Sequence, residues 1–137
     1  MVDLITHLEE LSINAWAPLQ SMNYDGWVIR VANGYTKRAN AIHPLYPSKK
    51  SLDEKIAFCE KLYRVRGLPT TFKLTSASQP HGLDAILVKQ GYEPDPEVSV
   101  QTFALAEVND VISADVVIQS APSEAWQAAF QRMQNLS

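Results

Sequence analysis

The stretch LVKQGYEP, residues 87–94, has the pattern of a helix that ends and leads into a strand. An apolar helix end runs into Gly91, which is followed by the aromatic Tyr92 and the acidic Glu93. Glycine readily adopts the left-handed backbone conformation that closes many helices. We therefore expect a short helix over residues 81–90, capped by Gly91, and the alternating pattern of residues 97–106 predicts the strand that follows.

Residues 52–66 form the helix with the clearest start and stop signals in the chain. Ser51 and Glu54 have the spacing of a capping box, in which each side chain bonds a free amide at the helix start. Gly67 stands where a left-handed residue is wanted, and Pro69 prevents continuation. The expected buried stripe consists of Leu52, Ile56, Cys59 and Tyr63.

Two further helices are predicted near the ends of the sequence. Residues 3–16 carry apolar side chains at spacings of three and four, and Pro18 ends this pattern. A second apolar stripe begins after Ser123. The two stripes consist of Leu4, Leu8, Leu11 and Ala15, and of Trp126, Phe130 and Met133.

Three strands are expected between these helices. Residues 26–32, GWVIRVA, are rich in β-branched and aromatic side chains. Asn33-Gly34 predicts a tight reversal, and residues 37–44 are the returning strand, which Pro44 ends. Residues 70–75, TTFKLT, predict another strand.

This mixed order of helices and strands, with a hairpin among them, predicts the fold class. We expect an α/β (α+β) fold with a mixed, partly antiparallel sheet flanked by helices. We assign residues 3–106 to this domain. The polar, acidic residues 107–115 are interpreted as a linker, and residues 116–137 as a further short strand followed by the last helix.

Composition limits the classes of protein to which the chain can belong. With 137 residues, 46% hydrophobic and 20% charged, it has the composition of one soluble globular domain. Cys59 is the single cysteine, which excludes an internal disulfide and a cysteine-based metal site. The three histidines show no metal-ligand spacing, and no apolar run is long enough for a membrane span. We expect a cytoplasmic protein with no metal and no membrane partner.

The charge distribution is uneven along the chain. The overall net charge of −3 argues against nucleic acid as the main partner. Residues 30–89 contain eleven Lys and Arg against four Asp and Glu, a net charge of +7, whereas residues 91–137 have a net charge of −6. Two interpretations stay open: two solvated faces of one domain, or a central region that handled an anion such as a phosphorylated cofactor.

The order of elements, with VKQGYEP in its place, resembles the core of the GNAT acetyltransferases. The stretch from Gly26 to Tyr46 is similar, more specifically, to the N-terminal half of a bacterial subgroup that carries two GNAT-like halves, of which the second holds the cofactor. The resemblance covers residues 3–106, and residues 123–134 resemble the beginning of the second half of those proteins. The matching pieces are Arg38–Tyr46, Tyr46–Ser51, Leu52–Arg66, Thr70–Thr75, Leu83–Tyr92 and Val98–Leu105.

This resemblance implies acetyl-CoA as the cofactor, with its pyrophosphate on the loop Tyr46–Ser51. Such a loop needs glycines, whose backbone can approach the pyrophosphate closely, and several free amides. The chain has no glycine here, and Pro47 removes one amide donor. We therefore expect no tight binding of acetyl-CoA. The residues left to contact the cofactor are Ser48, Lys49, Lys50, Ser51 and Leu52.

The catalytic residues that the resemblance implies are also replaced. The family tyrosine that can protonate the departing CoA thiolate falls at Leu87, which has no proton to give. The family asparagine earlier in the same helix falls near Pro80. We therefore predict no catalytic residue in this chain. LVKQGYEP is interpreted as a helix end that is retained for packing, with Tyr92 filling the apolar position of the family phenylalanine.

Several polar and aromatic residues lie outside these motifs. Arg30, Arg38 and Asn40 fall within two expected strands. They belong either to an exposed sheet face or to a hydrogen-bonding cluster at a cleft or interface. Trp126 and Phe130 are candidates for the same interface. No carboxylate or nucleophile is placed beside His43 by the sequence, so a structural role is favoured for this histidine.

Three functions are compatible with these observations. The first is a GNAT-like N-acetyltransferase domain that is not catalytic by itself, the transfer from acetyl-CoA to an amine belonging to a missing C-terminal half. The second is a stand-alone acetyltransferase that uses Lys49 and Lys50 in a divergent loop. The third is a dimerisation or interaction module. The expected partner is the missing half or a second copy of the chain, with no nucleic acid.

Overall fold

A computed structural model describes residues 3–104, 106 and 119–134. The chain divides into two compact units, Met1–Pro96 and Glu97–Ser137, and each is described by itself. The elements of the first unit are α1 (Leu4–Ala15), β1 (Gln20–Tyr24), β2 (Trp27–Val31), the 3-10 turn η1 (Lys37–Ala39), β3 (Ile42–Pro44), α2 (Leu52–Val65) and α3 (Leu83–Lys89).

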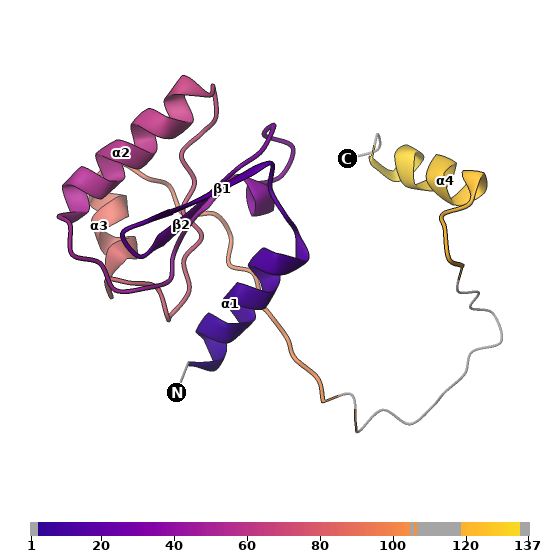
Figure 1. Ribbon diagram of the computed structural model, residues 1–137, viewed down its shortest axis with the longest axis horizontal. Helices are drawn as coiled ribbons and strands as arrows, with labels where there is room; N and C mark the ends of the chain where they lie inside the picture. The colour runs from indigo at the N-terminus through magenta and orange to yellow at the C-terminus, as the bar shows by residue number, and fades with distance from the viewer. Residues whose placement is uncertain (1–2, 105, 107–118, 135–137) are drawn as a thin grey trace. The chain divides into compact units, whose positions relative to one another are not determined.

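The sheet of the first unit has the order β1-β2-β3, with both pairs antiparallel (Figure 1). A parallel bridge between Ile42 and Phe72 adds a short piece of the predicted strand 70–75. The Ile42 amide donates to the Thr71 carbonyl at 2.8 Å, and the Lys73 amide donates to the Ile42 carbonyl at 2.9 Å. The predicted fold class, a mixed and partly antiparallel sheet with helices, is confirmed.

The hairpin differs from the prediction in its position. The tight turn is Asp25-Gly26, with φ of 43° and 85°, and it joins β2 to the unpredicted strand β1. The predicted reversal at Asn33-Gly34 is instead a wide loop that contains η1, and only 42–44 of the expected strand 37–44 is a strand. The Asn40 side chain holds this loop open: it accepts from the Ala32 amide at 2.7 Å and donates to the Thr36 carbonyl at 2.8 Å.

The two faces of the sheet differ in chemistry. Successive side chains of a strand point to opposite faces. On β2, Trp27, Ile29 and Val31 join the core cluster with residues of α2 and α3, whereas the Arg30 side chain donates to the Ile13 carbonyl of α1. The face under α2 and α3 therefore holds the hydrophobic core. Its buried members are Trp27, Ile29, Val31, Ile42, Ile56, Cys59, Tyr63, Leu83 and Leu87.

Helix α1 forms where the sequence predicts it, but its apolar stripe is not the buried side. Leu4 is 64% exposed and Leu11 is 50% exposed, whereas Glu9 is buried. The sheet face below α1 contains the buried side chains of Arg30 and His43. A carboxylate matches that polar face better than leucine does, so the predicted stripe was assigned to the wrong side of the helix.

Both ends of α2 and the C-terminal end of α3 follow the sequence signals. Two details differ: the Glu54 carboxylate of the predicted capping box pairs with Lys50, and α3 begins at Leu83 rather than at residue 81. The Ser51 hydroxyl accepts from the Glu54 amide at 3.3 Å, and Gly67 has a φ of 65°. At the end of α3 the Gly91 amide donates to Val88 at 3.0 Å and the Tyr92 amide donates to Leu87 at 3.1 Å. This pair of hydrogen bonds forms a Schellman motif, and Tyr92 packs against the core cluster that contains Leu87.

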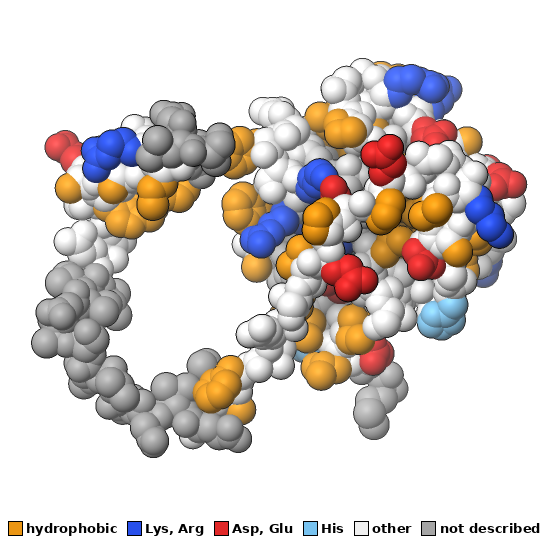
Figure 2. All heavy atoms as spheres, turned by 180° about the vertical axis from the view of Figure 1, so that it is seen from behind, with side chains coloured by type: hydrophobic (Ala, Val, Ile, Leu, Met, Phe, Trp, Pro, Cys, Tyr) orange, Lys and Arg blue, Asp and Glu red, His pale blue; other side chains and the backbone are white. Residues whose placement is uncertain are grey.

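In the second unit, α4 (Glu124–Gln134) confirms the predicted last helix. The Ser123 hydroxyl accepts from the Trp126 amide at 3.2 Å, and the Trp126 and Phe130 rings stack with centroids 5.2 Å apart. Both rings are exposed, and Figure 2 shows the hydrophobic side chains of α4 along one side of the helix.

The strand predicted over 97–106 is not observed among the described residues of that range. Val98, Val100 and Phe103 are exposed, and residues 97–104 have no strand partner. An alternating pattern makes a strand only beside another strand that takes up its backbone hydrogen bonds. The predicted linker 107–115 and the short strand 116–118 lie outside the described residues.

We predict that Gly26→Ala destabilises the fold much more than Gly67→Ala. A Cβ on Gly26 would lie 2.4 Å from the Tyr46 carbonyl oxygen and 2.5 Å from that of Pro47, whereas nothing lies within 4 Å of a Cβ on Gly67. Both residues have positive φ, so strain alone costs about 1–2 kcal/mol at either position. The overlap should raise the loss at Gly26 to about 2–5 kcal/mol.

Urea unfolding of the two variants, followed by circular dichroism, measures this difference. Gly67→Ala is the matched control because it adds the same methyl group at positive φ without the overlap. Equal losses for the two variants would contradict the close packing of the Asp25-Gly26 turn on Tyr46 and Pro47.

Candidate functional site

The predicted cofactor loop, residues 46–51, joins β3 to α2, and a carboxylate from the β1–β2 turn is bound to it. The Asp25 carboxylate accepts from the Lys50 amide at 2.8 Å and from the Lys49 amide at 3.0 and 3.1 Å. A pyrophosphate on this loop would need the same amides. Two amides that could otherwise bind a phosphate therefore already donate to the side chain of Asp25.

Lys55, in the first turns of α2, completes this contact. Its side chain is fully buried, its ammonium donates to the Asp25 carbonyl at 2.6 Å, and it lies 3.6 Å from the Asp25 carboxylate. The same ammonium lies 4.1 Å from the centre of the Trp27 ring, a cation–π contact. Burial lowers the pKa of Lys55, and the Asp25 charge opposes this. The Lys50 amide is the main cause that lowers the pKa of Asp25.

We call Asp25, Lys55 and the amides of Lys49 and Lys50 the Asp25 clamp. Beside it, the Lys50 ammonium pairs with the Glu54 carboxylate at 2.7 Å. The other loop candidates lie on the same short segment but are not in the clamp. Ser48 is exposed, the Ser51 hydroxyl caps α2, and Leu52 packs against the core.

The position of the family tyrosine is part of the core. Leu87 is buried in α3, and its carbonyl accepts the Tyr92 amide of the cap. The nearby Cys59 thiol is also buried, which raises its pKa to about 12. Leucine has no ionisable group, and the raised pKa keeps the Cys59 thiol protonated at neutral pH.

Arg30 and Asn40, two of the residues predicted for a cleft or interface, lie inside the first unit. The Arg30 guanidinium donates to the carbonyl of Arg38 at 2.5 Å, to that of Ile13 at 3.2 Å and to that of Trp16. It therefore ties the end of α1 to the loop before β3, while the Arg38 side chain is exposed. Trp126 and Phe130 belong to the second unit.

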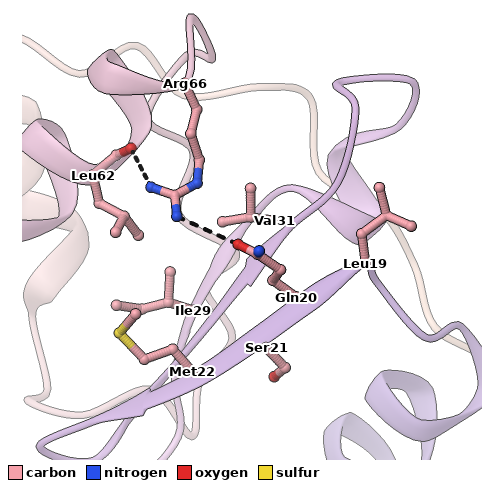
Figure 3. Close-up of a pocket in the computed structure, with 8 residues that line it drawn as sticks. All are labelled: Leu19, Gln20, Ser21, Met22, Ile29, Val31, Leu62 and Arg66. Atoms are coloured by element: carbon pink, nitrogen blue, oxygen red, sulfur yellow. Dashed lines mark hydrogen bonds between the residues drawn. The ribbon is translucent and has the colours of Figure 1, made fainter.

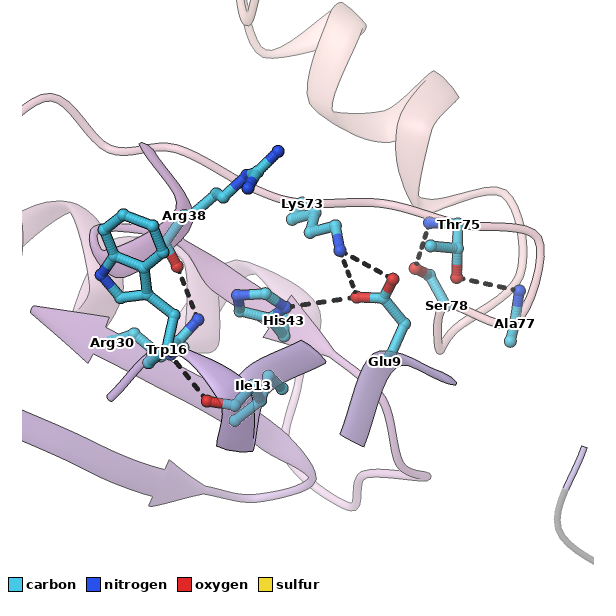
Figure 4. A network of polar contacts seen from close by, with 10 residues as sticks. All are labelled: Glu9, Ile13, Trp16, Arg30, Arg38, His43, Lys73, Thr75, Ala77 and Ser78. Atoms are coloured by element: carbon cyan, nitrogen blue, oxygen red, sulfur yellow. Dashed lines mark hydrogen bonds and ion pairs between the residues drawn. The ribbon is translucent and has the colours of Figure 1, made fainter. Parts of the chain in front are cut away.

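A second polar cluster, which sequence reasoning missed, lies between α1 and the sheet (Figure 4). The Lys73 ammonium lies 2.7 Å from both oxygens of the Glu9 carboxylate. The His43 Nδ1 atom lies 3.6 Å from the same carboxylate, and its ring is buried. Glu9 and Lys73 are 64 residues apart, and no local pattern could have paired them. We call these three residues the Glu9 cluster.

In the Glu9 cluster, burial and the neighbouring groups have opposite effects on the pKa values of Glu9 and His43. His43 foremost, and Lys73 after it, lower the pKa of the Glu9 carboxyl against the effect of burial. Burial lowers the pKa of His43, and the Glu9 carboxylate opposes this. A neutral imidazole beside a carboxylate has the composition of a general base, but the ring is closed off from solvent. The arrangement attaches α1 to the sheet.

The structure gives two further results for the residues that it describes. None of their helices has both the length and the apolar character to cross a membrane. No three or more of their His, Cys, Asp and Glu side chains gather closely enough to hold a metal ion.

Comparisons with known proteins indicate an acetyltransferase relationship. Residues 3–137 match the family described as probable histone acetyltransferase Rv0428c C-terminal. The chain is also 27% identical, over 140 residues, to the uncharacterized N-acetyltransferase YobR of Bacillus subtilis (strain 168). This match covers 99% of the chain and 56% of YobR, so the chain spans little more than half of that relative's length. No solved structure matches the chain.

We predict that the protein loses stability in acid through the Glu9 cluster. His43 and Glu9 both have lower pKa values in the folded chain than their ordinary values of 6.5 and 4.5. The unfolded chain therefore takes up these protons first, and acid favours unfolding. The free energy of unfolding should fall as the pH drops below about 6.5, and fall more steeply below about 4.5.

Urea unfolding between pH 8 and pH 4 checks this for the wild type and for Glu9→Gln. The variant should be less stable at pH 7 and should lose more stability than the wild type between about pH 6.5 and about pH 4.5, because His43 no longer has the carboxylate that opposes the lowering of its pKa. The steeper fall below about pH 4.5 should be absent from the variant, which has no carboxyl at position 9. The control is Glu93→Gln, which removes an exposed carboxylate. A Glu9→Gln protein with the same pH dependence as the wild type would contradict the role of the cluster.

Proposed function

The chain belongs to the acetyltransferase family described as probable histone acetyltransferase Rv0428c C-terminal, and we propose that its GNAT-like part, residues 3–106, does not bind acetyl-CoA by itself. In this proposal it is the supporting half of a longer cytoplasmic N-acetyltransferase. The transfer from acetyl-CoA to an amine is then carried out by sequence outside this chain.

The Asp25 clamp is the observation that carries the proposal. A pyrophosphate is held by several backbone amides that converge on it. Here the Lys49 and Lys50 amides already donate to the Asp25 carboxylate at 2.8–3.1 Å. A bound pyrophosphate would have to displace this carboxylate, and the two negative charges would repel each other at such a distance.

The packing around the loop supports the same conclusion. The Gly26 backbone leaves no room between the β1–β2 turn and the carbonyl oxygens of Tyr46 and Pro47, and the Tyr46 amide donates to the Gly26 carbonyl at 2.9 Å. These carbonyls present negative partial charge to the turn. At the position of the family acid, Leu87 is buried and cannot protonate a thiolate.

The place of this region within a longer protein is part of the proposal. YobR has the additional length that a second half needs, since the chain covers 56% of it. The matched family is described by the C-terminal part of Rv0428c, whereas we propose an N-terminal half here. A glycine-rich cofactor loop encoded after Ser137 would support this assignment.

We predict that calorimetric titration of acetyl-CoA into the full chain at low salt gives no saturable binding. Low salt is chosen because screening would otherwise hide weak contacts of Lys49 and Lys50. Saturable binding in the low micromolar range, abolished by Lys49→Ala with Lys50→Ala, would overturn the proposal and favour a stand-alone acetyltransferase. Lys61→Ala with Lys89→Ala removes the same charge elsewhere and serves as the matched control.

We also propose that α4 is an association element. Trp126, Phe130 and Met133 are exposed on one side of a helix of eleven residues, and a helix of that length is marginally stable in water by itself. The proposed partner is the other half of the longer protein or, in its absence, a second copy of this chain.

We expect light scattering to show an apparent mass that rises with the concentration of the full chain. Trp126→Ala with Phe130→Ala should abolish the rise. Gln127→Ala with Gln131→Ala, which changes the polar side of the same helix, should not. A chain that stays monomeric up to high concentration would remove the dimer from the proposal.

A further inference from the structure

The outer edge of β1 has no strand beside it in the described part of the chain. The order β1-β2-β3 leaves β1 at the edge, and residues 20–23 are exposed. Natural sheets usually protect such edges with charged residues, proline or a bulge. The sequence of β1, QSMNY, has no charge and no proline, and its register with β2 is continuous over all five residues. This edge can therefore accept another strand.

The turn geometry identifies which amides point outward. The two-residue turn Asp25-Gly26 makes Tyr24 and Trp27 the hydrogen-bonded pair that closes the hairpin. Hydrogen bonding alternates along an antiparallel strand, so the Met22 amide points towards β2. The amides of Ser21 and Asn23 then point away from β2, to the free edge.

An apolar groove lies over this edge strand on the side of α2 (Figure 3). Its volume is about 430 Å³. Leu19 is 71% exposed and Met22 is 40% exposed, so both apolar side chains are accessible to a ligand in the groove. The groove is lined by Leu19, Gln20, Ser21, Met22, Ile29, Val31, Leu62 and Arg66.

Arg66 gives the groove a fixed positive charge. Its guanidinium donates to the Leu62 carbonyl at 3.1 Å and to the Gln20 side-chain oxygen at 3.3 Å (Figure 3). Both acceptors are neutral, and no carboxylate among the described residues forms an ion pair with Arg66. A guanidinium held in this way is complementary to a carboxylate of a ligand.

We propose that β1 and this groove bind an extended, acidic segment of another protein as a fourth strand. The segment's backbone would pair with the Ser21 and Asn23 amides, its apolar side chains at alternate positions would enter the groove, and a carboxylate would pair with Arg66. A strand of about five residues, at about 3.3 Å per residue, matches the length of β1. A second copy of β1 does not fit, because QSMNY supplies no carboxylate.

The probe for this proposal is the synthetic peptide VTVTET with blocked ends, titrated into the full chain. Its two valines and its glutamate lie on one face of a strand, so that all three can meet the groove and Arg66. Fluorescence anisotropy should show saturable binding, and NMR should show exchange of the Ser21 and Asn23 amides slowed about tenfold at saturation. Arg66→Glu should weaken binding about fivefold or more. Lys61→Glu makes the same charge change on α2 outside the groove and should leave binding unchanged.

The controls separate this mode of binding from others. The peptide VTVTKT, in which lysine replaces the glutamate, should bind more weakly than VTVTET. Arg66→Gln replaces Arg66→Glu if circular dichroism shows that the latter does not fold. Absence of binding, equal binding to the Arg66 and Lys61 variants, or binding without slowed exchange at Ser21 and Asn23 would each overturn the proposal. So would slow exchange of these amides in the chain alone, since the edge would then already be paired.

Discussion

The contact between the Asp25 carboxylate and the loop before α2 is the constraint on which the first unit depends. It joins the β1–β2 turn to the start of α2, and it permits Lys55 to be fully buried because the ammonium meets both the carbonyl and the carboxylate of Asp25. An unpaired ammonium at that position would be costly. The positive φ of Asp25 and Gly26 brings the carboxylate to the Lys49 and Lys50 amides. The conformation of the turn therefore fixes the position of the loop and of the start of α2.

The unlike faces of the sheet have consequences for stability. The face under α2 and α3 is held by apolar burial, which depends little on pH. The face under α1 is held by the Glu9 cluster and by the Arg30 guanidinium, while the leucines of α1 remain largely exposed. Helices with few buried apolar contacts open more easily than core elements. We therefore expect α1 to be the helix of the first unit that separates first from the sheet.

Sequence reasoning succeeded where the signal is local and failed where it is not. Ser51, Gly67 and Gly91 act through neighbours in the chain, and both ends of α2 and the C-terminal end of α3 were predicted correctly. The strand β1 has no apolar alternation because it is an exposed edge, so no pattern indicated it. The partners of Asp25 and Glu9 are set by the folded sheet, and no spacing rule connects them. The alternation at 97–106, which shifts by one residue after Thr102, predicted a strand that the described residues of that range do not form.

If the GNAT-like part does not bind acetyl-CoA, as we propose, the Asp25 clamp explains how the shape of a family motif can remain without its chemistry. Gly91 and Tyr92 are needed for the end of α3 and for core packing, so the fold retains them whether or not a cofactor binds. The Lys49 and Lys50 amides lie just before Ser51, the cap residue of α2, and both donate to the Asp25 carboxylate as their anionic partner. A covalently attached carboxylate is present at a high effective concentration, independent of any ligand. Once Asp25 supplies that partner, glycines that would admit a pyrophosphate are no longer required, and the loop can accept Pro47.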